Sequence, residues 1–168
     1  MTFPHQLLSS NSISLARLLP QIGYHAWAAA QDPGHPCTLI IPSGNMGNCV
    51  AALMAKRMGA PIARVHIACN ENNAVAEYIN HRTKTFEPKP TVVTPASAMD
   101  VGKASNFVRL EYLGAREDAA VSAGSTSSTN IAIVQNEIGV CPHTACGYDN
   151  LIHVPYADPR VIVVATAS

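Results

Sequence analysis

The stretch Thr38-Leu39-Ile40-Ile41-Pro42-Ser43-Gly44-Asn45-Met46-Gly47-Asn48 decides the fold of this 168-residue chain. Its first four residues are apolar or β-branched and predict a short buried strand. The glycine- and asparagine-rich residues that follow predict a turn, and a helix is expected from Asn48 to Met58, ending at Gly59. A second buried strand is predicted at 65–69. Strand, glycine-rich turn, helix and strand form the βαβ unit of an open parallel sheet, so the sequence predicts an α/β fold.

Helices and short strands are expected on both sides of this unit along the chain. Apolar residues recur at helical spacing from Ser10–Asn11 to Trp27, and Pro20 inside the pattern should kink or split that helix. The Ser-, Thr-, Gly- and Ala-rich stretch 119–130 is interpreted as linker-like within a single domain that covers residues 1–168. Further helices are predicted at 74–80, 106–113, 131–138 and 144–151, an edge strand at Val92–Val93, and a late strand at 161–165.

Composition argues against several classes of function. The chain has 11 basic and 11 acidic residues, and only 13% of its residues are charged. This balance gives no electrostatic reason to expect a nucleic-acid or anionic-membrane partner. No apolar run approaches the roughly 20 residues of a membrane span, and no signal peptide is expected. The five cysteines are odd in number and lie mostly in apolar segments. They indicate reduced thiols and a cytoplasmic protein, with an organellar form as the open alternative.

The loop Ser43–Asn48 carries the clearest chemical prediction. It lies between a predicted strand and a helix N-terminus, where unpaired backbone N–H groups and the positive end of the helix dipole converge. Gly44 and Gly47 would let the backbone wrap closely around an anion and would allow positive φ. Neither the Walker A nor the G-x-G-x-x-G pattern is present, so a ligand smaller than a dinucleotide is expected. An ordinary β-to-α turn, in which glycine and asparagine are common, is the equally favoured alternative.

Residues 42–48, Pro-Ser-Gly-Asn-Met-Gly-Asn, resemble the Pro-(Ser/Thr)-Gly-Asn-Phe-Gly-(Asn/Asp) loop of threonine synthases. One block alone would be a weak signal, whereas an ordered set of blocks covers most of the chain. The other blocks that resemble the family's motifs are the Asn-Ser-Ile helix at 11–21, the helix end at 55–62, Asn-Glu-Asn-Asn at 70–73, Ser-Ala-Met-Asp at 97–100, Ser-Asn-Phe-Val-Arg at 105–109, Pro-His-Thr-Ala at 142–145 and Ala-Thr-Ala at 165–167. The chain is therefore similar to pyridoxal-phosphate enzymes of the tryptophan-synthase-β-like fold (fold type II). This likeness implies a three-layer αβα domain with a mainly parallel sheet.

The resemblance also implies a cofactor site and a reaction. The phosphate of pyridoxal 5′-phosphate would lie on the loop, and Thr166 would meet the pyridine nitrogen of the cofactor. Asn11, Ser12 and Arg17 would lie near the substrate phosphate. The implied reaction, that of a carbon–oxygen lyase acting on phosphate, converts O-phosphohomoserine and water to threonine and phosphate. The loop residues implied to hold the cofactor phosphate are Gly44, Asn45, Met46, Gly47 and Asn48.

No lysine of the chain matches the Schiff-base lysine of the family. Lys56, Lys84, Lys89 and Lys103 lie outside the family's Lys-Asp block, so no catalytic residue is assigned. The chain is therefore interpreted as a truncated, C-terminal-half fragment of the cofactor-binding region, shortened at both ends and in the middle. Turnover would then require a complementing N-terminal domain or self-association. A non-catalytic remnant, a partner subunit and a phosphometabolite-binding module are the alternatives.

Other residues with reactive side chains receive structural interpretations. Cys141, His143 and Cys146 lie close together, but structural zinc needs four ligands, so no metal site is expected. Cys49, just inside the second predicted helix, is the one thiol with a helix-dipole argument for reactivity, and the sequence places no base beside it. His66 is interpreted as a packed strand histidine.

Overall fold

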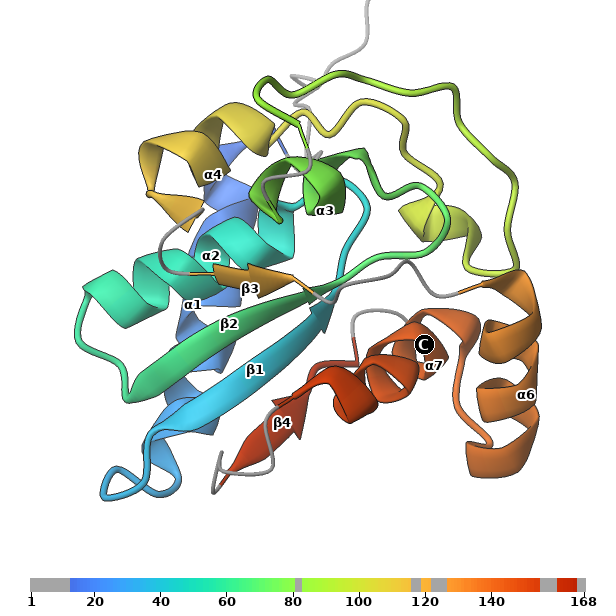
Figure 1. Cartoon of the computed structure of the whole chain (residues 1–168). Helices are drawn as coiled ribbons and strands as arrows, with labels where there is room; N and C mark the ends of the chain where they lie inside the picture. Colours follow the sequence, from blue (N-terminus) through green and yellow to red (C-terminus); the bar gives the residue numbers. More distant parts are fainter. Residues whose placement is uncertain (1–12, 81–82, 116–118, 122–126, 155–159, 166–168) are drawn as a thin grey trace, which may run out of the picture.

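The computed structural model describes residues 13–80, 83–115, 119–121, 127–154 and 160–165. A four-stranded parallel sheet lies at its centre, in the order β3-β2-β1-β4 (Figure 1). The glycine-rich loop and helix α2 (Gly47–Arg57) connect β1 to β2, which confirms the predicted βαβ unit and the α/β fold class. The strands are β1 (Cys37–Pro42), β2 (Ile62–Ala68), β3 (Ala119–Val121) and β4 (Val161–Val163).

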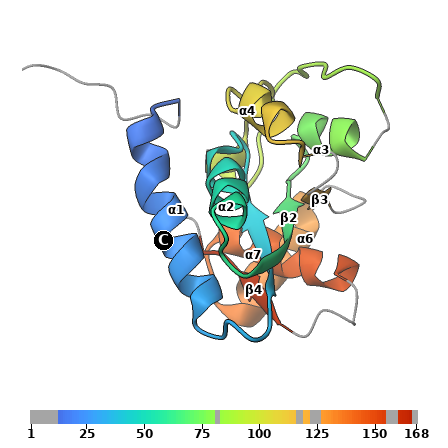
Figure 2. The same ribbon diagram turned by 90° about the vertical axis from the view of Figure 1, so that its left-hand side faces the viewer.

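Helices cover both faces of this sheet and give the molecule three layers (Figures 1 and 2). This arrangement confirms the αβα architecture implied by the family resemblance. Two short 3₁₀ helices, η1 (Ser97–Met99) and η2 (Asn150–His153), lie in the connections. One face carries α1 (Leu15–Ala30), α2, α3 (Ala74–Ile79) and α4 (Phe107–Tyr112), and the other carries α6 (Ser128–Ile138) and α7 (Pro142–Asp149).

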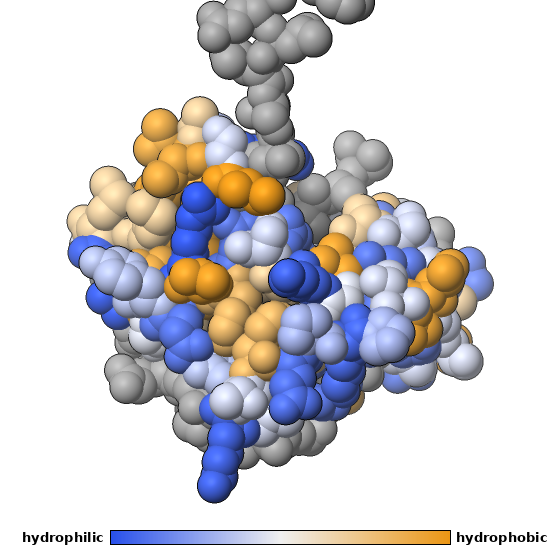
Figure 3. Space-filling model, turned by 90° about the horizontal axis from the view of Figure 1, so that it is seen from above, coloured by the Kyte–Doolittle hydropathy of each residue, from blue (hydrophilic) through white to orange (hydrophobic). Residues whose placement is uncertain are grey.

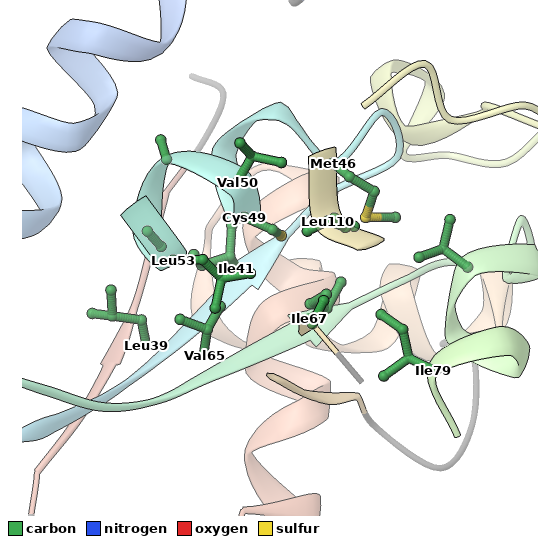
Figure 4. Close-up of a cluster of buried hydrophobic side chains, with 14 of the residues drawn as sticks. Leu39, Ile41, Met46, Cys49, Val50, Leu53, Val65, Ile67, Ile79 and Leu110 are labelled. Carbon is green, nitrogen blue, oxygen red and sulfur yellow. The ribbon is translucent and has the colours of Figure 1, made fainter. Parts of the chain in front are cut away.

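The central strand β1 separates two hydrophobic cores. Successive side chains of a strand point to opposite faces. Leu39 and Ile41 accordingly pack with residues of α2 and β2, whereas Ile40 packs with residues of α7. Figure 4 shows the larger core, in which Leu53 of α2 and Val65 of β2 lie beside the β1 side chains. Because all six residues of β1 are buried, the strand reads as one continuous apolar run in the sequence.

Val92 and Val93 form no edge strand, so that prediction is wrong. The N–H of Val92 donates to Asn72 Oδ1 (2.8 Å), and the carbonyl of Val92 accepts from Asn72 Nδ2 (2.9 Å). A side-chain amide therefore occupies the backbone groups that a neighbouring strand would have paired. Both valines are exposed, Val93 at 88%.

The stretch 119–130, interpreted as linker-like, contains regular secondary structure within the described residues. Ala119–Val121 forms β3 and pairs in parallel with β2. Small side chains do not prevent this, because a sheet ladder is formed by backbone groups. Helix α6 begins at Ser128, whose N–H and hydroxyl both donate to the Glu71 carboxylate at 2.9 Å. The structure thus differs from the linker-like interpretation at 119–121 and 128–130, and the single-domain assignment stays a prediction.

Helix α1 runs through Pro20 without interruption, so the expected split is wrong (Figure 2). Its inner side chains, such as Leu18 and Ile22, are buried in the larger core. Its outer side chains include Leu19 and Trp27, which are 62% and 68% exposed. The helix therefore presents apolar side chains on both its faces.

Arg160, immediately before β4, holds the C-terminal end of α1. Its guanidinium donates to the carbonyls of Ala28 (2.6 Å), Ala29 (2.8 Å) and Asp32 (3.2 Å). The last carbonyls of a helix have no partner within the helix, and an arginine side chain can satisfy them. The position of α1 therefore depends on a residue near the other end of the sequence.

An apolar groove lies between α1, α2 and α4. It is lined by Leu15, Val50, Met54, Val108 and Tyr112, among other residues. In the face shown in Figure 3, hydrophobic side chains gather toward the side of the molecule where α4 lies, while hydrophilic ones are spread between them. Exposed apolar surface of this kind is typical of interaction surfaces, and self-association stays a prediction.

Two expectations from composition can be compared with the structure. All five cysteines are free, and four of them are buried. Among the described helices, none combines the length and the apolar character needed to cross a membrane.

Candidate functional site

The loop between β1 and α2 lies at the carboxyl edge of the sheet, where ligands bind in open α/β folds. The Ser43 N–H extends the sheet ladder by donating to Ala68 O (3.0 Å), and the Ser43 hydroxyl accepts from the Met46 N–H (3.1 Å). Met46 has φ 63° and ψ 4°, in the left-handed region. The chain therefore turns sharply at Met46 and enters α2 at Gly47.

The left-handed residue of the loop is Met46, and not Gly44 or Gly47 as the sequence suggested. A non-glycine residue in this conformation is uncommon and costs about 1–2 kcal/mol. The Met46 side chain is only 1% exposed and packs in the larger core, which offsets the strain. Such strain is found preferentially at functional sites. Here it places the first N–H groups of α2, which no helical carbonyl accepts, beside the loop.

Gly44 allows a second segment to approach the loop closely. A Cβ at this position would lie 2.5 Å from the carbonyl oxygen of Met99 and 2.7 Å from its Cα. The turn Ser97–Met99 therefore rests directly on the loop backbone. Residue 44 must therefore be glycine because of this close contact, and not because of a positive φ.

Two asparagine side chains of the loop are fixed in orientation by hydrogen bonds. Asn45 Oδ1 accepts from the N–H and from the hydroxyl of Ser105, at 2.6 and 2.8 Å. Asn48 Oδ1 accepts from Nε2 of His25 on α1, at 2.5 Å. Ser105 and His25 each donate to an amide oxygen. The NH₂ group of each asparagine therefore points away from that partner.

A cavity of about 180 Å³ lies against this loop. Its walls come from four separate segments of the chain: α1, the loop, the turn at 97–99 and the first turn of α7. The volume is below the about 300–1,000 Å³ of most small-molecule sites, so the cavity suits a small group or one end of a larger ligand. It is lined by Arg17, Gln21, Pro42, Ser43, Gly44, Asn45, Met46, Gly47, Asn48, Ala98, Met99 and His143.

A network of side chains that converges on Asp100 holds the wall at 97–99. Asp100 Oδ1 accepts from Asn70 Nδ2 (2.8 Å), Asn72 Nδ2 (3.2 Å) and Thr94 Oγ1 (2.7 Å), and Asp100 Oδ2 accepts from the Thr94 N–H (2.9 Å). Asn70 and Asn72 lie two and four residues after the end of β2. The network therefore attaches this wall to the carboxyl end of the sheet, and it gives the asparagine-rich turn a structural role.

Two histidines, the buried His25 and the half-buried His143, connect the walls of the cavity, and both are neutral at pH 7. Burial lowers the pKa of His25, against the opposing effect of its hydrogen bond to Asn48. Burial also lowers the pKa of His143, against the opposing charge of Asp100. The neutral His143 ring accepts a hydrogen bond from the Ala98 N–H at Nε2, over 3.1 Å. This bond joins α7 to the turn at 97–99.

The cysteines near the cavity have packing and capping roles. Cys49 is fully buried, and this burial raises its pKa to about 12, so its thiol is protonated at neutral pH. The helix-dipole argument for a reactive Cys49 is therefore outweighed by desolvation. Cys141 Sγ accepts from the Thr144 N–H at 3.4 Å and caps α7, while Cys146 packs in the smaller core. In the part of the chain that the structure describes, no group of three or more His, Cys, Asp and Glu residues could hold a metal ion.

The structure brings together most of the site residues predicted from the sequence. Arg17 and all five loop residues from Gly44 to Asn48 line the cavity. Asn11, Ser12 and Thr166 lie outside the described residues. None of the lining residues is a lysine.

Sequence analysis assigned no role at the site to Gln21 and His143, whose side chains come from α1 and α7 and which both line the cavity. Gln21 follows Arg17 by four positions on one helix, and residues at that spacing share a helix face. That spacing was a usable signal. His143 was weighed as a zinc ligand and matched to the family block at 142–145, and no spacing in the sequence indicated that the first turn of α7 reaches the turn at 97–99.

Comparison with individual curated proteins repeatedly finds threonine synthases. No protein-family model matches the chain. The chain is 34% identical to the threonine synthase of Haemophilus influenzae, across 96% of this chain and 40% of that protein. It is 35% identical to the threonine synthase of Escherichia coli, across 84% of this chain and 35% of that protein. Mouse threonine synthase-like 1 is 38% identical across 67% of this chain and 16% of its own length. The chain thus spans about two fifths or less of these curated relatives.

Solved structures agree with the sequence comparison. The crystal structure of threonine synthase from E. coli superposes with a TM-score of 0.79 at 29% identity, over 91% of this chain and 38% of that one. Threonine synthase from Brucella melitensis, solved with PLP bound, superposes with a TM-score of 0.82 at 25% identity, over 96% of this chain and 42% of that one. A pyridoxal 5′-phosphate-dependent aspartate racemase (TM-score 0.65, 13% identity) shares the fold alone.

Proposed function

We propose, on the premise that this chain is a homologue of the threonine synthases, that it forms the phosphate-binding part of a pyridoxal-phosphate site. The reaction proposed for the complete site converts O-phosphohomoserine and water to threonine and phosphate. One observation carries the proposal. The cavity at the N-terminus of α2 is lined by Arg17 and by all five loop residues that the family resemblance assigned to phosphate binding.

The chemical groups around this cavity suit a phosphate. The first N–H groups of α2 have no acceptor within the helix, and a helix N-terminus favours a negative charge. Arg17 lines the cavity from α1 and adds a positive charge, and no acidic residue is among the lining residues. The first turn of α2 likewise has no acidic side chain. A phosphate group is also small enough for the volume of the cavity.

The residues of this chain bind and orient the cofactor in this proposal. Pyridoxal phosphate, when bound, supplies an electron sink for the substrate carbons. The loop backbone holds the phosphate, and Asn45 and Asn48 present amide groups that Ser105 and His25 already hold in place. Thr166 is proposed, from the family resemblance alone, to meet the pyridine nitrogen. Arg17, with Asn11 and Ser12, is proposed to bind the substrate phosphate.

We assign the remaining groups of the site to the part of the threonine synthases that this chain does not match. The chain matches about two fifths of the threonine synthase of H. influenzae, and no lysine lines its cavity. The proposal therefore assigns covalent attachment of the cofactor and proton transfer to a complementing region, on the same polypeptide or on a partner chain. A cytoplasmic location is part of the proposal and is supported by five free cysteines.

The first test compares two ligands that differ only in the phosphate group. The purified chain is titrated with pyridoxal 5′-phosphate and, separately, with pyridoxal. We expect saturable binding of pyridoxal 5′-phosphate that is at least about tenfold tighter, because hydrogen bonds to a charged group contribute roughly 1.5–3 kcal/mol each. Inorganic phosphate should compete for the site. Equal affinity for the two ligands, or no saturable binding, would contradict the proposal.

A phosphometabolite-binding module is a second candidate function, favoured by the lack of lysine among the residues that line the cavity. Borohydride reduction of the loaded protein, followed by intact-mass measurement, separates the candidates. A stoichiometric adduct on one lysine would support a self-contained cofactor site. Saturable binding without an adduct would support a cofactor site that needs a complementing lysine. Binding of O-phosphohomoserine alone, with no binding of pyridoxal 5′-phosphate, would support the module.

A further inference from the structure

Two side chains that line the cavity each hold a buried polar atom with no hydrogen-bond partner. They are Gln21, at Oε1, on the α1 wall, and His143, at Nδ1, on the α7 wall. Buried polar atoms are paired in the great majority of cases, and each exception needs an explanation. Both exceptions adjoin the same cavity, although their helices lie near opposite ends of the sequence.

The protonation state of His143 follows from its other nitrogen. A backbone N–H can only donate, so Nε2 of His143, which accepts from the Ala98 N–H at 3.1 Å, carries no proton. In a neutral imidazole the proton must then be on Nδ1. The residues that line the cavity therefore include one unused donor, the Nδ1–H of His143, and one unused acceptor, the Oε1 of Gln21, and neighbouring atoms cover both of them in this structure.

We propose that Gln21 and His143 are ligand-contacting residues of this cavity, in addition to the loop, and that small shifts of the atoms covering them open both groups to the ligand. His143 Nδ1–H donates to an unprotonated phosphate oxygen of the ligand, and Gln21 Oε1 accepts from an O–H of the same ligand. The ligand class that offers both groups is a phosphate monoester with a protonated phosphate oxygen or a hydroxyl beside it. This inference rests on the proposed function and adds two contacts to the same site.

The proposed Gln21 contact predicts an unusual effect of substitution on the stability of the protein. Removing an unpaired buried polar group relieves its desolvation, so Gln21→Leu should leave the ligand-free protein as stable as the wild type, or more stable. The same change should weaken pyridoxal 5′-phosphate binding about 3- to 10-fold, because one hydrogen bond is lost. A glutamine that only supported the fold would behave in the opposite way, with lower stability and unchanged affinity.

Gln31→Leu is the matched control for Gln21→Leu. Gln31 follows the same helix and donates from Nε2 to the carbonyl of Trp27 at 2.9 Å on the exposed surface. It is not among the residues that line the cavity. The affinity of this variant for pyridoxal 5′-phosphate should equal that of the wild type.

Two substitutions of His143 separate its two nitrogen atoms. In His143→Gln, Oε1 can replace Nε2 as the acceptor from Ala98, while the Nδ1–H donor is lost. We expect nearly wild-type melting and affinity lowered about 10- to 100-fold, because the lost bond is to a charged oxygen. In His143→Asn, Nδ2–H can replace the donor, while the bond to Ala98 is lost. We expect a lower melting temperature and a smaller loss of affinity.

The experiment measures melting of the ligand-free variants and their affinity for pyridoxal 5′-phosphate by equilibrium dialysis. Weaker binding by Gln21→Leu and His143→Gln, with unimpaired melting, supports the inference. Wild-type affinity in both variants overturns it and leaves the proposed function standing. A large drop in melting temperature for Gln21→Leu also overturns it. If the wild type itself shows no saturable binding, the proposed function fails, and this inference fails with it.

Discussion

The cavity has two walls that are built in different ways. The loop wall at 43–48 is formed by main-chain geometry between a strand and a helix, with every residue except Asn45 and Asn48 buried. The opposite wall at 97–99 has only one short 3₁₀ turn, and side chains that converge on Asp100 hold it in place. Stability of the first wall is spread over many backbone groups. Stability of the second wall depends on the Asp100 carboxylate and on the bond from Ala98 to His143, so equal changes in the two walls should have unequal effects.

The largest effect is expected from Asp100→Ala. This change removes the acceptor for four hydrogen bonds, from Asn70, Asn72 and Thr94, and leaves buried donors without partners. We expect the free energy of unfolding to fall by about 3–4 kcal/mol, and the affinity for pyridoxal 5′-phosphate to fall with it. Urea denaturation measures the first quantity. Asp100→Asn, which keeps one acceptor oxygen, should lose about half as much, and a loss below about 1 kcal/mol in Asp100→Ala would show that the wall has other supports.

A smaller effect is expected where the two walls touch, at Gly44→Ala. The new Cβ would lie 2.5 Å from the Met99 carbonyl oxygen, so one wall must move. Overpacking of this kind costs about 1–3 kcal/mol. Gly23→Ala is the control, because no atom lies within 4 Å of a Cβ there and the residue is inside α1. It should stabilise the protein by about 0.5–1 kcal/mol. Thermal melting that changes in the same direction for both variants would contradict the contact.

Acid should weaken both walls, because a neutral histidine holds each of them. The folded-state pKa values of His25 and His143 are lowered by burial below the ordinary value of about 6.5. Between the folded and unfolded values, the unfolded chain binds more protons, so stability rises with pH. The contribution of each ring is therefore present above pH about 6.5 and is lost as the pH falls through its lowered value. Denaturation at steps from pH 7 to 5 should show a shallower loss in His25→Gln than in the wild type, and equal slopes would contradict this assignment.

The smallest effect is expected at Val93, on the segment that leads to the Asp100 network. Val93 is 88% exposed and belongs to no strand, so Val93→Thr should change the free energy of unfolding by no more than about 0.5 kcal/mol. The same substitution at Val65, which is fully buried in β2, should cost about 1–3 kcal/mol because it buries a hydroxyl group. Urea midpoints measure both. A large effect at Val93 would show that this segment is held by more than Asn72 and Asp100.

The sequence predicted the loop wall better than the opposite wall, for a physical reason. β1, the turn at 43–48 and α2 follow one another along the chain, so local patterns of burial and turn residues specify them. The opposite wall depends on contacts between residues far apart in the sequence. Asp100 and Asn70 are separated by 30 positions, and His143 and Ala98 by 45. Hydrogen bonds between residues so far apart along the chain produce no periodic pattern in the sequence.

The same reason explains the errors at single residues. Val92–Val93 has the composition of a strand, but the Asn72 side chain occupies the backbone groups of Val92. The positive φ of the loop was expected at glycine and occurs at Met46, because burial of the Met46 side chain in the core offsets the strain. Pro20 was expected to kink or split α1, yet the helix is not split, and it packs on α2.

The hydrogen bonds between Arg160 and the end of α1 also set an order of events during synthesis. They join residues 131 and 132 positions apart. At a translation rate of about 5–20 residues per second, roughly 7 to 26 seconds pass between the synthesis of Ala28 and Ala29 and the synthesis of Arg160. During that interval α1, which carries Arg17 and Gln21, lacks its attachment to the last strand. The ligand cavity is thus completed near the end of translation of this segment, so a nascent chain that stalls before residue 160 exposes the helix without a finished site.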